Sequence, residues 1–270
     1  MKSPASALPP AGDSVSLGAG RRHWRVSPSA VDLTEPPPPP RIIEIEAAPH
    51  VARLDIARSA MIVIDMQNDF LSPGGVADSG GRDLSGGRAT IDPLKRVLPI
   101  LRQADVPIIW LNWGNRPDRM NLPPPTLYGF NPDGRRPGIG GELPGGKGRV
   151  LEQGGWPAAI VPELVPEEGD IHVAKYRISG FWDTPLDSIL RNLDIRTAFF
   201  AGVNIDVCVL HTIADAAFLG YNCILLEDCA ATSAPDFCHQ AAVFNVRKCF
   251  GLVSNSAALV AGLSAGTPAE

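Results

Sequence analysis

The 270-residue sequence lacks several features that would assign it to a broad functional class. It contains no run of 18 apolar residues, so we expect no transmembrane helix and no membrane partner. Its formal net charge is only −5, which provides no basic surface for nucleic acid and favours a small-molecule partner. Residues 1–5 begin no apolar signal segment, so we expect a cytoplasmic protein.

Cysteine is scarce and unevenly placed. The five cysteines, residues 208, 223, 229, 238 and 249, include no Cys-x-x-Cys pair and have no histidine at zinc spacing. This pattern argues against both a disulfide framework and a structural metal site. The apolar neighbours of Cys223 and Cys249 favour simple burial. Cys208 alone lies at a predicted strand-to-helix turn, where free N–H groups and the helix dipole would favour its thiolate.

The first 55 residues differ in composition from the rest. Ten of the 27 prolines fall within residues 1–49, including the run 36–40. Such a run favours the polyproline II conformation and does not enter the interior of a sheet. We therefore divide the chain into a proline-rich N-terminal extension, 1–55, and a hydrolase domain, 56–270. The extension either docks on the surface or on a neighbouring subunit, or it is a mobile tail.

From residue 59 onward, short apolar segments alternate with helical ones. The pattern predicts strands at 60–65, 106–111, 170–175, 197–201, 222–226 and 249–253, with helices at 91–104, 184–193, 209–219 and 235–247. Continuous apolar strands that alternate with helices are typical of a parallel sheet covered on both faces. The fold class is therefore α/β, a three-layer αβα arrangement with a mainly parallel sheet of roughly six strands. Residues 113–155 form a long glycine-rich excursion of the kind that often builds a functional site.

Three chemically distinct side chains end predicted strands: Asp65, Lys175 and Cys208. Strand ends of a parallel sheet meet at one edge, so we expect these groups to converge. There Asp65 could accept the thiol proton, Lys175 could hold the carboxylate ionised, and Cys208 could attack a carbonyl carbon. The backbone N–H groups of Cys208 and Asn204 could stabilise the resulting oxyanion. Taken singly, Asp65 as a turn cap and Lys175 as a solvated strand end are equally ordinary readings.

The segments Ile62–Phe70 and Gly202–Val209, with Lys175 between them, resemble the isochorismatase-like cysteine hydrolases. Within that family the match is closest to the ureidoacrylate amidohydrolases and biuret hydrolases. Agreement in order and spacing extends through residues 163–166, 184–191, 226–228 and 242–245, so that the resemblance covers about residues 57–255. It implies that Asp65, Lys175 and Cys208 form a catalytic triad, and that a non-proline cis peptide joins Val203 and Asn204.

The resemblance also bears on cofactors and assembly. The nicotinamidase branch carries metal ligands, among them histidines, after its second strand, whereas residues 112–120 here contain no histidine. We therefore predict an enzyme without metal or other cofactor, which releases ammonia or an amine from a small ureido, carbamoyl or amide substrate. Family members usually form dimers or tetramers, which implies a homo-oligomer here.

Candidates for the substrate pocket come from the excursion and from the segments beside the triad. Aromatic walls would clamp a planar ureido group, and an amide side chain could bind its N–H groups. Four arginines, 116, 119, 135 and 136, could pair with a substrate carboxylate. His211 follows Cys208 on the predicted helix, but we assign it no role. The candidate pocket residues are Phe70, Asn112, Trp113, Tyr176, Phe181 and Trp182, with Gln67 and Tyr128 as further possibilities.

Two other functions remain open from the sequence. One is hydrolysis of a vinyl ether, as in isochorismatases that lack the cysteine, with Asp65 as the acid and Cys208 as a bystander. The other is a binding or scaffold protein on the same fold, which would use the proline-rich extension as its interaction segment.

Overall fold

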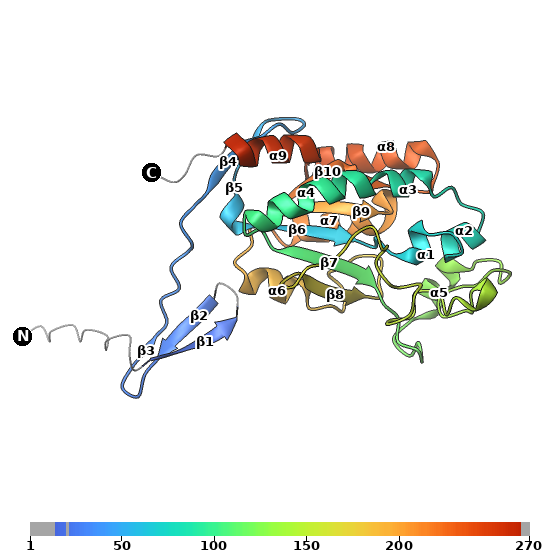
Figure 1. The fold of residues 1–270 in the computed structure, drawn as a ribbon, viewed down its shortest axis with the longest axis horizontal. Helices are drawn as coiled ribbons and strands as arrows, with labels where there is room; N and C mark the ends of the chain where they lie inside the picture. Colours follow the sequence, from blue (N-terminus) through green and yellow to red (C-terminus); the bar gives the residue numbers. More distant parts are fainter. Residues whose placement is uncertain (1–13, 20–21, 266–270) are drawn as a thin grey trace, which may run out of the picture.

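A six-stranded parallel sheet forms the centre of the computed structural model, which describes residues 14–19 and 22–265 (Figure 1). Every neighbouring pair in this sheet is parallel, and the strand order is β11-β10-β9-β6-β7-β8. The strands are β6 (Ser59–Ile64), β7 (Ile108–Trp113), β8 (Ile171–Lys175), β9 (Thr197–Val203), β10 (Asn222–Ala231) and β11 (Gly251–Ser254).

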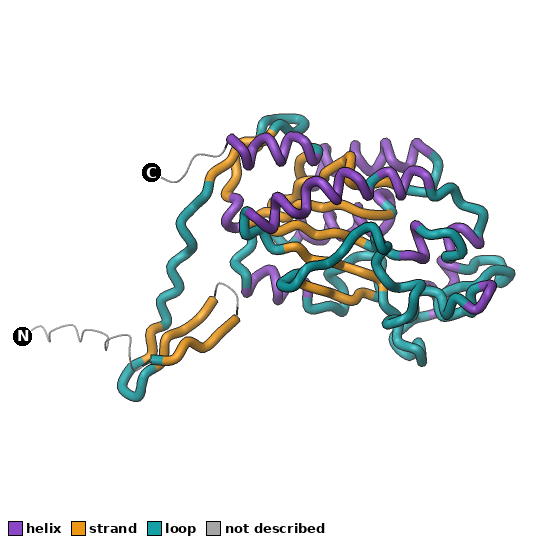
Figure 2. Tube along the Cα trace, viewed as in Figure 1, coloured by secondary structure: helices purple, strands orange, loops and turns teal. Residues whose placement is uncertain are grey.

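Helices cover both faces of the sheet, which confirms the predicted three-layer αβα fold (Figure 2). On one face, α4 (Ile91–Gln103) and α9 (Ser256–Ala265) bury leucines and other apolar side chains against β6, β7 and β9. On the other face, α6 (Leu186–Asn192), α7 (Leu210–Phe218) and α8 (Asp236–Asn245) join the second core cluster. Because β6 and β9 are covered on both sides, all of their residues are buried, as continuous apolar strands require.

The strand order reverses between β6 and β9. From β6 the chain proceeds outward through β7 and β8, then returns to β9 on the other side of β6 and proceeds outward through β10 and β11. A ligand site is expected beyond the carboxyl ends of the strands at such a reversal. Gly202 allows the two central strands to approach there: its φ is +114°, and a Cβ at this position would lie 1.9 Å from the carbonyl oxygen of Ile64.

Several short elements lie outside the sequence prediction, most of them too short for a periodic pattern to indicate. They are α1 (Asn68–Leu71), α2 (Val76–Ser79), α3 (Ser85–Ala89) and α5 (Pro124–Phe130), with 3₁₀ turns at Ile56–Arg58 and Pro144–Gly146. π-helical turns at Ile205–Val209 and Val246–Phe250 adjoin α7 and α8. Within the described residues no helix is both long and apolar enough to cross a membrane.

The N-terminal residues contain strands that the proline content hid. A three-stranded antiparallel sheet, β1 (Val15–Ala19), β2 (Arg22–Val26) and β3 (Val31–Asp32), projects from the body in Figure 1. A hairpin of β4 (Ile42–Ile45) and β5 (Ala52–Asp55) instead buries alternate residues in the core beside α9. Residues 1–13 of the predicted extension lie outside the described residues, and the division at residue 55 stays a prediction.

Candidate active site

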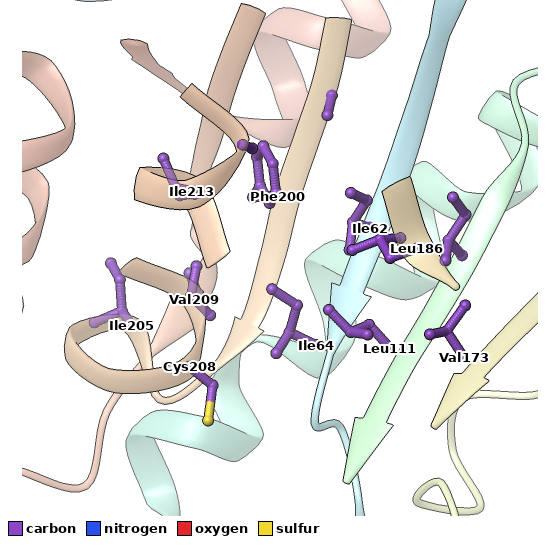
Figure 3. Close-up of a cluster of buried hydrophobic side chains, with 14 of the residues drawn as sticks. Ile62, Ile64, Leu111, Val173, Leu186, Phe200, Ile205, Cys208, Val209 and Ile213 are labelled. Atoms are coloured by element: carbon purple, nitrogen blue, oxygen red, sulfur yellow. The ribbon is translucent and has the colours of Figure 1, made fainter. Parts of the chain in front are cut away.

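The three strand-end residues meet beyond the carboxyl edge of the sheet. Asp65 directly follows β6 and has a positive φ of 52°, Lys175 is the last residue of β8, and Cys208 lies in the π-helical turn after β9. Figure 3 shows Cys208 past the strand ends, with its sulfur directed away from Ile205 and Val209 of the same turn. Apolar side chains of β6, β7 and β8 (Ile64, Leu111 and Val173) lie side by side above this edge.

Lys175 lies between the other two groups. Its Nζ is 2.8 Å from Oδ2 of Asp65 and donates a hydrogen bond of 3.4 Å to Sγ of Cys208. A third contact, of 3.3 Å, goes to the carbonyl oxygen of Arg177. Asp65 and Lys175 have no exposed surface, and Cys208 is only 5% exposed. The sequence prediction that these three groups converge is thus met by the geometry.

Burial changes the protonation of this cluster. It raises the pKa of the Cys208 thiol, the Asp65 carboxylate raises it further, and the Lys175 ammonium opposes both without reversing the shift. Burial by itself lowers the pKa of Lys175, but the charges of Asp65 and Cys208 outweigh it, so the net pKa is raised. Desolvation thus raises the pKa of Cys208, against the expectation that the position of the turn favours its thiolate.

Trp113 and Gln67 form the frame around this ion pair. The backbone N–H of Trp113 donates to Oδ1 of Asp65 and to Oε1 of Gln67, each over 2.9 Å. The indole ring of Trp113 lies under the lysine, with Nζ 4.4 Å from the ring centroid. Gln67 uses its amide hydrogens on the carbonyl oxygens of Trp113 and Ala158, at 2.7 and 2.6 Å. Gln67 therefore holds the backbone of Trp113 and Ala158. Its amide group is used in these bonds and is not free for the contact with substrate that the sequence allowed.

The turn that carries Cys208 contains the cis peptide bond between Val203 and Asn204 that the family resemblance implied. The carbonyl oxygen of Asn204 accepts hydrogen bonds from the N–H groups of Val207 and Val209. Its side-chain oxygen accepts a further bond from the N–H of Ser233, at 3.2 Å, which ties this turn to the segment after β10. Asn204 and Cys208, the two predicted oxyanion donors, thus belong to one fixed turn.

The predicted pocket residues fall into separate places. Phe70 is half-buried and packs against both core clusters, and Tyr176 follows Lys175 directly. Tyr176 lines an open cavity of about 490 Å³ together with Gly114, Arg116, Met120, Asn121, Gln153 and Ala174. Asn112 precedes Trp113 on β7, so its side chain leaves the opposite face of the strand.

Phe181 and Trp182 are held elsewhere by their own contacts. The Phe181 ring lies 6.0 Å from the ring of Tyr221, which precedes β10 at the amino edge of the sheet. The indole N–H of Trp182 donates to Asp215 in the second half of α7, and its side chain is 64% exposed. These contacts do not bring either ring to Cys208, which lies before α7 begins. Phe181 is accounted for by its packing beside Tyr221, and Trp182 is held at α7 by its hydrogen bond to Asp215.

The remaining polar candidates have ordinary partners. Arg116 is paired with Asp118 at 2.6 Å, and Arg119 and Arg136 reach backbone carbonyl oxygens. His211 is exposed, and its Nδ1 lies 2.7 Å from the carbonyl oxygen of Val207. Tyr128 is exposed on α5. Among the residues the structure describes, no group of three or more His, Cys, Asp and Glu side chains is placed to hold a metal ion.

Two buried polar residues near the site were absent from the sequence prediction. Asp69 and Asn115 have no exposed surface, and both hold the polypeptide of the glycine-rich excursion. For Asp69 the available signal was the density of polar residues from Asp65 to Asp69, directly after the apolar run Ala60–Ile64. Polar side chains so close to a buried strand are expected to have dedicated partners.

A parallel α/β sheet with a buried acid, amine and thiol at its strand reversal is the arrangement that the sequence predicts for a cysteine hydrolase. The chain belongs to the isochorismatase family: the family's Isochorismatase domain matches residues 59–258. Over 227 residues the chain is 38% identical to the ureidoacrylate amidohydrolase RutB of Klebsiella variicola (strain At-22), which covers 84% of this chain and 96% of that protein.

Solved structures agree with this assignment. A cysteine hydrolase from Pseudomonas syringae pv. phaseolicola 1448A superposes with a TM-score of 0.65 at 25% identity, over 78% of this chain and 94% of that one. The N-carbamoylsarcosine amidase from Thermoplasma acidophilum gives a TM-score of 0.56 at 26% identity, over 74% and 96% of the two chains. The family resemblance predicted from the sequence is confirmed.

Proposed function

We propose that this protein is a cysteine amidohydrolase that cleaves a C–N bond of a small ureido compound, with ureidoacrylate as its substrate. The observation that carries the proposal is the position of Lys175, whose Nζ contacts both the Asp65 carboxylate and the Cys208 sulfur in a buried site. The choice of substrate is supported by the 38% identity to a ureidoacrylate amidohydrolase.

The first half of the reaction forms a bond between Cys208 and the substrate. Asp65 takes the thiol proton, and the sulfur attacks the carbonyl carbon of the ureido group. The oxyanion is held by the backbone N–H groups of Asn204 and Cys208, which contribute on the order of 3 kcal/mol each. The C–N bond then breaks, and the proton on Asp65 passes to the departing nitrogen, which leaves as ammonia or an amine. Lys175 keeps its proton throughout and offsets the negative charge that moves between the carboxylate and the sulfur.

The second half releases the carbonyl group. Asp65 takes a proton from a water molecule, and the resulting hydroxide attacks the carbonyl carbon of the thioester or thiocarbamate on Cys208. The C–S bond breaks and the sulfur regains a proton from Asp65. The cycle requires substrate, water and these residues only, and therefore no metal or other cofactor.

The test compares Cys208→Ser with Cys223→Ser. Cys223 is also a buried thiol, and its sulfur is hydrogen-bonded to backbone carbonyl oxygens. Cys223→Ser therefore controls for the loss of a buried sulfur. Ammonia release would be measured with ureidoacrylate, biuret, N-carbamoyl amino acids and aryl amides. We expect Cys208→Ser to lose at least about 10³-fold in kcat, with Cys223→Ser close to wild type. Intact-mass detection of an acyl adduct on Cys208 supports the mechanism, whereas wild-type turnover by Cys208→Ser overturns it.

The substrate carboxylate distinguishes ureidoacrylate from biuret, which has none. We propose that Arg116, in the cavity beside Tyr176, pairs with this carboxylate in place of Asp118. Arg116→Gln should then raise KM for ureidoacrylate about tenfold and leave KM for biuret or a neutral amide unchanged. An equal effect on charged and neutral substrates would contradict this assignment, without bearing on the roles of the triad.

We also propose that the protein is cytoplasmic.

We propose further that it forms a homo-oligomer through its N-terminal sheet. The cross-strand pairs Val15–Val26 and Leu17–Trp24 place apolar side chains on one face of that sheet, and Val31 extends the same face. Apart from the half-buried Val26, these side chains are exposed. A small sheet needs such a face to be covered. Light scattering should show an oligomer that Leu17→Ser with Trp24→Ser dissociates; an unchanged mass would contradict the proposal.

A further inference from the structure

Asp69, four residues after the proposed catalytic Asp65, is a buried carboxylate that the reaction described above does not use. It lies in α1 with no exposed surface. Its Oδ2 accepts a hydrogen bond of 2.7 Å from the backbone N–H of Leu151, and its Oδ1 accepts one of 3.0 Å from that of Val76. A buried carboxylate is costly unless such bonds compensate it, so its presence calls for a specific role.

The hydrogen bond from Leu151 to Asp69 fixes the backbone near the end of the excursion. Leu151 has a positive φ of 55°, and its carbonyl oxygen accepts a hydrogen bond of 2.8 Å from the backbone N–H of Asn115. The side-chain amide of Asn115 donates to the carbonyl oxygen of Val150 over 3.0 Å. Asp69 thereby fixes the backbone on which Asn115 rests.

The side chain of Asn115 connects this backbone to the ion pair. Oδ1 of Asn115 accepts the indole N–H of Trp113, whose ring lies 4.4 Å from Nζ of Lys175. The backbone N–H of Trp113 holds Oδ1 of Asp65. The ring is therefore anchored at both ends, with its electron-rich face toward the ammonium.

Other groups around Lys175 explain why this ring matters. The titratable neighbours are Asp65 from the end of β6 and Cys208 from the π-helical turn, and the carbonyl oxygen of Arg177 is a further acceptor. Movement of the ring would leave the ammonium with fewer favourable contacts in a site that excludes water. A shift of about 1 Å in such groups can cost a hundredfold in rate.

We propose that Asp69 and Asn115 are positioning residues, which hold the Trp113 ring against Lys175 through the hydrogen-bonded chain Asp69, Leu151, Asn115, Trp113. This inference rests on the proposed function for its kinetic readout, but the geometry of the chain is independent of the substrate. It assigns the glycine-rich excursion a part in the charge arrangement of the site.

The experiment uses Asp69→Asn and Asn115→Leu, singly and together. Each should lower kcat about tenfold to a hundredfold with KM within about threefold, and move the alkaline limb of the pH–rate profile to lower pH because Lys175 loses its proton more easily. Because both residues act through one chain, the double variant should lose less than the product of the single losses. Trp113→Phe, which keeps a ring face, should be less impaired than Trp113→Leu.

Asn68→Leu is the matched control. Asn68 neighbours Asp69, is buried, and holds the backbone directly after the excursion, through a hydrogen bond of 2.9 Å from its amide to the carbonyl oxygen of Trp156. It has no part in the chain to Trp113. This variant should lose stability but keep the pH–rate profile of the wild type. A profile that is unmoved in Asp69→Asn and Asn115→Leu, or moved equally in Asn68→Leu, overturns the proposal.

A readout without turnover separates this proposal from the proposed function. With ¹⁵N-labelled lysine, the Lys175 resonance is identified by its absence from Lys175→Met, and its titration is followed by NMR. We expect a lower pKa for Lys175 in Asp69→Asn and Asn115→Leu than in the wild type or Asn68→Leu. An unchanged pKa overturns the positioning role even if ureido turnover is confirmed, and a lowered pKa supports it even if that turnover is absent.

Discussion

Lys175 and Asp65 form an ion pair of 2.8 Å in which neither side chain has any exposed surface. Two charges are seldom removed from water to this extent, because desolvation offsets much of their mutual attraction. The pair lies next to the buried thiol of Cys208. The ion pair therefore serves chiefly to set the charges around that thiol. Its removal should lower both the stability of the protein and its turnover.

The first prediction concerns Lys175→Met, which leaves the Asp65 carboxylate buried without its cation. The variant should be inactive and lose about 3–5 kcal/mol of unfolding free energy in urea titrations. Lys147→Met is the control, because Lys147 is exposed over the Trp156 ring and should contribute less than about 1 kcal/mol. Equal stability of the two variants would contradict the prediction. Since the pKa of Lys175 is raised above 10.5, its contribution should persist below that pH and be lost only as the pH rises through the higher folded value.

The second prediction concerns Asp69 and pH. Burial raises the pKa of this carboxyl from 3.8 to about 6, against the opposing hydrogen bonds from Leu151 and Val76. Between those pH values the folded state binds more protons than the unfolded state, so this residue's contribution to stability falls as the pH rises. Relative to Asp69→Asn, which cannot ionise, the wild type should lose about 2 kcal/mol between pH 4 and pH 6.5. A constant difference across thermal melts in this range would refute the shift.

The third prediction concerns Gly202. An alanine there would place its Cβ 1.9 Å from the carbonyl oxygen of Ile64, on the strand that leads to Asp65. Gly202→Ala should cost more than about 4 kcal/mol or prevent folding. Gly220→Ala is the control: its φ of +91° is also positive, but no atom lies within 4 Å of the added Cβ, so only backbone strain of about 1–3 kcal/mol is expected. Comparable melting temperatures for Gly202→Ala and Gly220→Ala would show that the close approach of Gly202 to Ile64 does not limit stability.

The fourth prediction separates the thiols. Cys249 is exposed, so the burial that its apolar neighbours favoured is wrong for this residue, whereas Cys208 is buried and its pKa is raised. Iodoacetamide at neutral pH should therefore modify Cys249 first, without loss of activity, as peptide mapping and parallel assays can establish. Cys249→Ser should remove this fast reaction. Activity lost at the same rate as the first cysteine is modified would contradict this prediction, because it would mean that Cys208 is reached by the reagent far more often than its burial implies.

Much of the fold could be predicted because its strands and longer helices have strong periodic patterns. The segment Ala60–Ile64 is apolar throughout, and the structure places β6 at Ser59–Ile64 in the middle of the sheet. Asp65, Lys175 and Cys208 could be brought together because each lies at or just beyond the carboxyl end of such a segment. That the three meet at one edge follows from the parallel topology, which strand–helix alternation indicated.

The rest depended on contacts that a linear pattern does not contain. The proline-rich start concealed β1 to β5, since their pairing is set by neighbours and not by length or periodicity. Trp182 has the character of a pocket residue in the sequence, but in the structure its indole N–H donates a hydrogen bond to Asp215. The raised pKa of Cys208 could not be foreseen, because the helix terminus is visible in the sequence whereas the degree of burial is not.

The distribution of the site over separate strands has a consequence for how the protein acquires its reactivity. Asp65 and Lys175 follow strands on one side of the reversal, but Cys208 enters only when β9 pairs beside β6. A chain that has formed β6, β7 and β8 alone therefore possesses an acid and an amine but no nucleophile. During synthesis or refolding, recovery of turnover should report completion of the central pairing and lag behind compaction of the chain.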